Sequence, residues 1–166
     1  MVNIKLIKSV LLVLITITII IVLKVFGLFD RSPSSSESTL QQLADAFYNE
    51  CIKYPSLTDF LNNSFVLYAN QLSGFIVTNL QVYVIQIIRQ KYHIHVGNNL
   101  TPEQQQEAQN MTNQILLTQV QPCVVNPLVL KYQTCDNVHN NFDAFLTDFV
   151  ALTKTCIDKV INQSSN

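Results

Sequence analysis

Charged residues, glycine and tryptophan are all scarce in this chain of 166 residues. Lys, Arg, Asp and Glu make up 13% of it, about half of the roughly 25% that is usual in soluble domains. The glycines Gly27, Gly74 and Gly97 lie far apart, which excludes the glycine-rich loops that bind nucleotide phosphates. Ten dispersed basic residues are too few for a nucleic-acid-binding face, so we expect no nucleic-acid partner.

The net charge of −1 hides two segments of opposite sign. Residues 1–31 carry four basic residues and one acidic residue, and the remainder carries six and ten. The basic segment also holds the longest apolar run, which follows Lys5 and Lys8. A cationic stretch before such a run is typical of membrane targeting. The predicted membrane residues are Val10, Leu11, Leu12, Val13, Leu14, Ile15, Ile17, Ile19, Ile20, Ile21, Val22 and Leu23.

Length leaves two interpretations of this segment open. As a helix, residues 10–23 span about 21 Å, which is short for a ~30 Å hydrocarbon core and typical of a cleavable signal peptide. Extension to Phe29 gives the full thickness, and the Ser-rich stretch at 32–38 is typical of a tether, so an uncleaved anchor is favoured. Cleavage near Gly27 is the alternative, and it would release a secreted protein.

The positions of the charges around the apolar run predict the topology. Basic residues precede the run, so the short tail should stay cytoplasmic and the rest should be extracytoplasmic. We therefore expect a tail with a signal anchor or signal peptide at 1–29, a linker at 30–38, and an extracytoplasmic domain at 39–166.

Every cysteine lies in the predicted extracytoplasmic domain. An even number of cysteines in an exported domain predicts disulfides. Three pairings are possible, and the absence of a clear helical period around Pro122 and Pro127 favours a local Cys123–Cys135 bridge, with Cys51–Cys156 as the second bridge. No Cys-x-x-Cys pair occurs, so we expect neither zinc binding nor redox chemistry. The four predicted disulfide residues are Cys51, Cys123, Cys135 and Cys156.

Apolar spacing and capping residues predict about five helices. Starts are marked by Thr39 with Gln42, by Ser56 with Asp59, and by Thr101 before Pro102. The predicted helices cover 39–54, 56–72, 75–95, 101–120 and the residues from 136 onward. We expect an all-α fold, a disulfide-stapled antiparallel helical bundle behind the N-terminal hydrophobic helix. A seam with steps of three and four marks the last helix: Val138, Phe142, Phe145, Phe149, Leu152 and Cys156.

Candidate chemical sites are weak. Near a helix end, His93 and His95 point about 200° apart, which does not favour a shared metal. Glu103 and Glu107 lie at a helix start, where carboxylates favour the helix dipole. We expect no catalytic residue, no metal and no cofactor. Four Asn-x-Ser/Thr sequons predict N-linked glycosylation: Asn62, Asn99, Asn110 and Asn162.

Two functions fit these observations. The leading hypothesis is a non-enzymatic extracytoplasmic interaction module, tethered or secreted, that acts by contact with an unknown protein partner. The alternative is a secreted helical carrier that binds a lipid or another apolar small molecule between its aromatic helices, although such residues more often form a core. The residues that would line this apolar pocket are Phe47, Phe60, Phe65, Phe75, Phe142, Phe145 and Phe149.

Overall fold

The computed structural model describes the backbone of residues 36–163 and the side chains of residues 39–163. The chain divides into two compact units, Met1–Ser38 and Thr39–Asn166, and only the second is described below. The predicted membrane segment and the alternative cleavage site lie outside the described residues. A helix begins at Ser36, so the last part of the predicted linker is helical.

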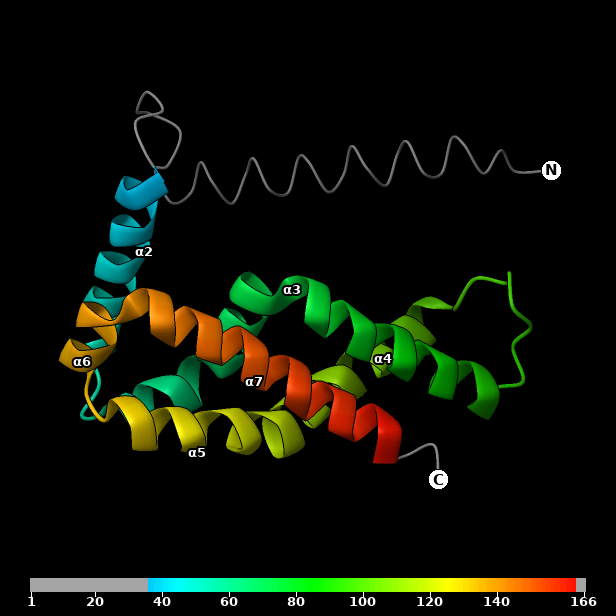
Figure 1. The fold of residues 1–166 in the computed structure, drawn as a ribbon. Coiled ribbons are helices and arrows are strands. Elements are labelled where there is room, and N and C mark those ends of the chain that lie inside the picture. The colour runs from blue at the N-terminus through cyan, green and yellow to red at the C-terminus, as the bar shows by residue number, and fades with distance from the viewer. Residues whose placement is uncertain (1–35, 164–166) are drawn as a thin grey trace. The chain divides into compact units, whose positions relative to one another are not determined.

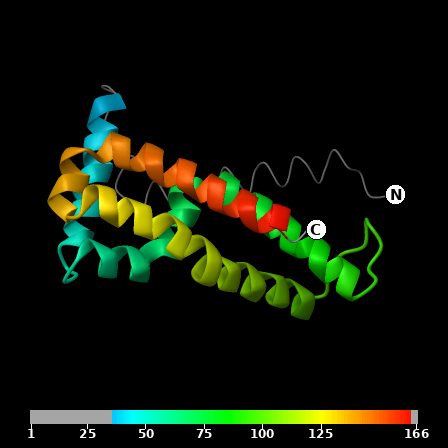
Figure 2. The same ribbon diagram turned by 60° about the horizontal axis from the view of Figure 1, so that its bottom comes forward.

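The described residues form a bundle of helices, and no strand occurs among them. Long helices that follow one another in the chain run in opposite directions along the bundle, whereas α3 (Leu57–Lys91) and α7 (Phe142–Gln163) run the same way (Figures 1 and 2). The antiparallel arrangement predicted from the sequence therefore holds for some pairs and not for all. The elements are α2 (Ser36–Cys51), α3 (Leu57–Lys91), α4 (Pro102–Ile115), the π-helix η1 (Leu116–Val120), α5 (Gln121–Tyr132), α6 (Cys135–Asn140) and α7 (Phe142–Gln163).

The second and third predicted helices are one bent helix, α3. Its start is capped as predicted, since the Ser56 hydroxyl accepts a hydrogen bond of 3.1 Å from the backbone N–H of Asp59. The bend lies at Ser73, whose φ of −131° and ψ of 26° interrupt the helical backbone next to Gly74. This is the break or bend that the Ser-Gly pair predicts.

By length and composition alone, α3 could cross a membrane. A central helix of a bundle has the same hydropathy, because it is covered on several sides. α3 packs against α4, α5 and α7, and its buried residues extend from Leu57 to Ile88. Burial in the bundle therefore accounts for only part of its apolar composition, since 28% of the 18-residue stretch that could span a membrane is buried.

The segment that the sequence analysis left without a helical period is helical. Helix α4 continues through the π-turn of η1 into α5, and Figure 2 shows the three as one long rod. Pro122 has no N–H to donate, and the backbone N–H of Gln121 reaches back five residues to the carbonyl of Leu116. The wider turn lets the helix pass the proline, and Pro127 is likewise accommodated inside α5.

The spacing of buried residues along this rod is a signal that the prolines obscured. Leu116, Val120, Val124, Leu128 and Tyr132 recur at every fourth position, and all are buried. Such a stripe at a spacing of four residues is typical of a helix with one face in a core.

The disulfide pairing in the structure differs from the predicted pairing, because residues 121–132 form the helix α5. The structure joins Cys51 to Cys135 and Cys123 to Cys156, with Cα–Cα distances of 5.9 and 6.1 Å. The predicted Cys123–Cys135 bridge is wrong because Cys123 lies at the start of α5 and Cys135 lies beyond its other end, at the start of α6, too far away for a disulfide. The observed bridges instead join α2 to α6 and α5 to α7. The prediction that all four cysteines form disulfides is confirmed.

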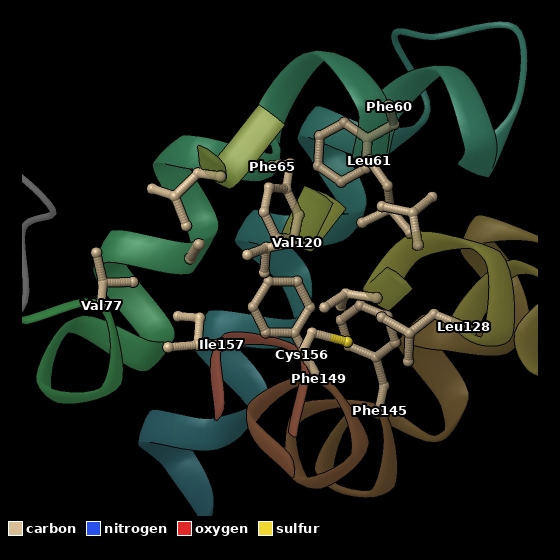
Figure 3. Packing of buried hydrophobic residues seen from close by; sticks show 14 of the residues in the cluster. Phe60, Leu61, Phe65, Val77, Val120, Leu128, Phe145, Phe149, Cys156 and Ile157 are labelled. Carbon is tan, nitrogen blue, oxygen red and sulfur yellow. The ribbon is translucent and has the colours of Figure 1, made fainter. Parts of the chain in front are cut away.

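The core is apolar and lies where α3, the α4–η1–α5 rod and α7 meet. Figure 3 shows Phe65, Val120 and Phe149 pointing toward one another at its centre. The predicted seam of the last helix is confirmed, with five of its six residues buried and Leu152 half-buried. The helix is not continuous, however, because Asn141 separates α6 from α7.

Candidate functional site

The predicted apolar pocket is filled by its own side chains. Phe47 lies among the other aromatic rings, with centroids 4.9 Å from Phe60 and 5.1 Å from Phe145. Rings at these distances are in contact and leave no room for a ligand between them. Phe75 does not belong to this cluster, because it is 84% exposed on the surface of α3. Its assignment to a pocket is therefore wrong.

Two shallow hollows lie elsewhere on the surface. One runs along α4 and is lined by Pro102, Glu103, Gln106, Glu107 and Asn110. The other lies near the end of α7 and is lined by Thr155, Asp158, Lys159, Asn162 and Gln163. Each is formed by side chains of one helix, and no phenylalanine lines either. Neither hollow has the apolar lining and enclosure that a carrier of lipids needs.

The histidines are not brought together. His93 and His95 lie in the loop between α3 and α4, while His139 lies on α6. Within residues 36–163, no group of three or more His, Cys, Asp or Glu side chains is arranged to hold a metal ion.

His139 instead helps to attach α2 to α6. Its Nε2 atom lies 2.7 Å from Oδ1 of Asp45, and its ring lies against the ring of Tyr48. The Tyr48 hydroxyl in turn donates a hydrogen bond of 2.9 Å to Asp136. The hydrogen bond with His139 is the main cause of the lowered pKa of Asp45. These contacts lie beside the Cys51–Cys135 bridge and complete the attachment of α2.

Glu107 is a structural residue. It accepts hydrogen bonds from Nζ of Lys91, at 2.6 Å, and from the hydroxyl of Tyr92, at 2.8 Å. Its partner in the sequence pair, Glu103, lies in the first turn of α4, where hydrogen bonds from its own backbone N–H and from the side chain of Thr101 lower its pKa. The two carboxylates therefore do not converge on a common site.

The arrangement around Glu107 occurs a second time in the fold. At the end of α5, Lys131 and Tyr132 both donate to Oδ2 of Asp148 on α7, at 2.6 and 2.7 Å. In each case a Lys-Tyr pair ends one helix, the next residue has a positive φ, and a carboxylate on a following helix binds both side chains. The hydrogen bonds from lysine and tyrosine lower the pKa of Glu107 and of Asp148. We call these two sets the Lys-Tyr-carboxylate clusters; they fix helix ends.

The predicted glycosylation residues are exposed. Asn99 lies in the loop before α4, whereas Asn62, Asn110 and Asn162 lie on helices. Asn62 also accepts a hydrogen bond from the side chain of Gln121 at 2.9 Å. Their use as glycan acceptors stays a prediction.

The least expected feature of the surface is the side of α3 that points away from the core. We define the outer face of α3 as the exposed residues Phe75, Thr78, Asn79, Val82 and Gln86. They occupy one side of the helix opposite the buried stripe. No Asp, Glu, Lys or Arg occurs between Asp59 and Arg89, so the whole of this face is uncharged.

A helical wheel of the sequence could have found this face. It places Thr78, Asn79 and Gln86 opposite the apolar arc, as the structure confirms, and Phe75 lies in the same polar arc. The sequence analysis instead grouped Phe75 with the phenylalanines of the predicted apolar pocket. Other exposed apolar side chains include Leu67, which lies on α3 before the bend, Leu130 on α5 and Val96 in the loop after α3.

No protein-family model, curated protein or solved structure matches this chain.

Proposed function

We propose that residues 39–166 form an extracytoplasmic interaction module that acts by contact with a protein partner, held at a membrane by the N-terminal segment. The alternative for that segment is cleavage, which would make the same module secreted. The module would carry out no chemical reaction itself.

The exposure of Phe75 is the observation that carries this proposal. Residues 39–163 contain seven phenylalanines; six are buried in the core, and Phe75 is 84% exposed. A large aromatic side chain on an uncharged surface loses contact with water when a partner covers it, and aromatic residues are enriched at the centres of protein interfaces. Val82, two helical turns further on, is half exposed on the same face and extends the apolar surface.

Disulfides support the location. Two bridges form between four cysteines, and no described cysteine is free. Disulfides persist in oxidising compartments outside the cytosol. Together with the predicted cationic and apolar N-terminal segment, this favours export of the domain.

Site-specific photo-crosslinking in the native membrane tests the contact. A photoreactive phenylalanine analogue at position 75 should give a covalent adduct with a protein, because the partner would cover that side chain. The matched control is the same analogue at Leu130, which is 78% exposed on α5. We expect adducts at position 75 at a yield at least about tenfold above those at 130.

Two results would contradict the proposal. Equal yields at the two positions would show that the outer face of α3 is not specially covered. Free thiols at the four cysteines in protein taken directly from the cell would show that the domain is not in an oxidising compartment.

A further inference from the structure

We infer that the partner covering the outer face of α3 is a second copy of this chain, paired so that the two α3 helices lie side by side and run the same way. This inference rests on the proposed contact function and names its partner.

The spacing of the outer face is that of a helix-pairing seam. Phe75, Asn79, Val82 and Gln86 are separated by steps of four, three and four residues. This is the spacing of the two apolar positions of a heptad, which keeps one stripe of side chains facing a partner helix. In a parallel pair, each of these residues meets the same residue of the other copy.

The chemistry of the seam suits self-association. Uncharged side chains carry no like-charge repulsion when two identical faces meet. An amide both donates and accepts hydrogen bonds, so Asn79 can pair with the Asn79 of another copy, and Gln86 likewise. Among the contacts within residues 36–163, neither amide has a hydrogen-bond partner from its own chain. A buried asparagine at such a position specifies the register of a helix pair, at a cost in stability.

Neighbouring charges are occupied or lie beyond the seam. Arg89, the first charge after the seam, donates to the carbonyls of His95 and Asn98, both at 3.0 Å, and so holds the loop after α3. Lys91 is bound by Glu107. The seam is therefore left as an apolar and amide surface.

The seam is short, so we expect the two copies to bind each other weakly. From Phe75 to Gln86 it covers about three helical turns, less than a stable dimer in free solution usually needs. A shared membrane tether raises the effective concentration of the two copies and makes such a weak contact productive.

Cysteine crosslinking of the full chain in membranes tests the pairing. With Val82→Cys, mild oxidation by copper–phenanthroline should join two copies through residue 82, because a parallel seam brings this residue against itself. Leu130→Cys is the matched control on another helix. We expect at least about ten times more of the species of twice the mass for Val82→Cys, and loss of that species when Phe75→Glu is added.

Copurification of two differently tagged full chains gives a readout without a new cysteine. The double variant Phe75→Glu, Val82→Glu should reduce copurification at least about tenfold, and Leu130→Glu should leave it unchanged. Native disulfides and helical circular dichroism in each variant show that the fold is retained.

The outcomes separate this inference from the proposed function. Equal crosslinking at positions 82 and 130, or copurification insensitive to the double variant, would overturn the pairing of copies. A Val82→Cys adduct with a different protein would also overturn it, while the proposed contact function would stand. Absence of any adduct at position 75 with any protein would overturn both.

Discussion

The two sides of α3 are both uncharged between Asp59 and Arg89 and opposite in role. On the inner side, Val77, Leu80, Val84 and Ile88 are each no more than 1% exposed, packed between the other long helices. On the outer face, Phe75 and Val82 project into solvent between amide and hydroxyl side chains. The hydropathy that would suit a membrane span is an average over both sides of the helix. The inner side of α3 holds the fold together, and the outer face is available for contact with a partner.

The largest expected effect comes from putting a charge on the inner side. Val84→Asp buries an unpaired carboxylate at a fully covered position, which we expect to lower the free energy of unfolding by about 5 kcal/mol or more. Val82→Asp, two residues away on the outer face, should change it by less than about 1 kcal/mol. Chemical denaturation followed by circular dichroism measures both. Similar losses in the two variants would contradict the division of α3 into two sides.

Removal of a disulfide should cause the next largest loss in the free energy of unfolding, without changing the contact at the outer face of α3. The Cys123–Cys156 bridge joins two helices that pack on the inner side of α3, and it closes a separation of 33 residues. In the chain-entropy model, replacing both cysteines of this bridge by serine lowers the free energy of unfolding by about 3.8 kcal/mol. The same change at the Cys51–Cys135 bridge, with its separation of 84, lowers it by about 4.6 kcal/mol. Denaturation under non-reducing conditions measures the difference. Where either variant still folds, crosslinking from position 75 should persist; its loss in a folded variant would show that the outer face depends on the bridges.

Acid should weaken the contacts that hold the helices covering the inner side. The pKa of Asp148 is lowered below its usual 3.8, first by the hydrogen bond from Lys131 and then by that from Tyr132. Its contribution is therefore present above the unfolded-state pKa and is lost as pH falls through the lowered value. Stability should decline below about pH 4, and Asp148→Asn should flatten this decline. Thermal melts from pH 6 to pH 2.5 test it, and identical acid profiles for the two proteins would argue against the assignment.

The smallest expected effect on stability comes from the outer face. Phe75→Ser removes a side chain that makes little contact in the isolated domain, so the free energy of unfolding should change by no more than about 0.5 kcal/mol. The same substitution should abolish crosslinking to a partner through Val82→Cys. A stability loss of several kcal/mol would show instead that Phe75 is part of the core.

Local signals predicted much of the fold. The caps at Ser56 and Thr101 each identified the start of a helix, and the steps of three and four from Val138 to Cys156 identified the buried side of α6 and α7, because capping and burial on one side act within a few residues of sequence. The Ser73-Gly74 pair likewise predicted the bend at Ser73.

Other features depend on contacts between distant segments and could not be predicted locally. Two prolines argued against a helix at 121–132, yet the π-turn before Pro122 accommodates the first of them, and Pro127 lies inside α5. The wrong prediction of the disulfide pairing followed from that error, since the correct pairing depends on which helix faces Cys123. The outer face was missed for a related reason: a phenylalanine in sequence is usually a core residue, and only its neighbours in space show otherwise.

Hydroxyl-radical footprinting of the full chain in its native membrane tests the central claim most directly, because Phe75 and Leu130 have similar exposure, 84% and 78%. Each residue serves as its own reference when its labelling in the membrane is compared with that in dilute detergent solution. The account predicts that Phe75 is protected in the membrane at least about fivefold relative to dilute solution, while Leu130 and Val96 are labelled equally in both. Unchanged labelling of Phe75 would contradict the claim that the outer face of α3 is a contact surface.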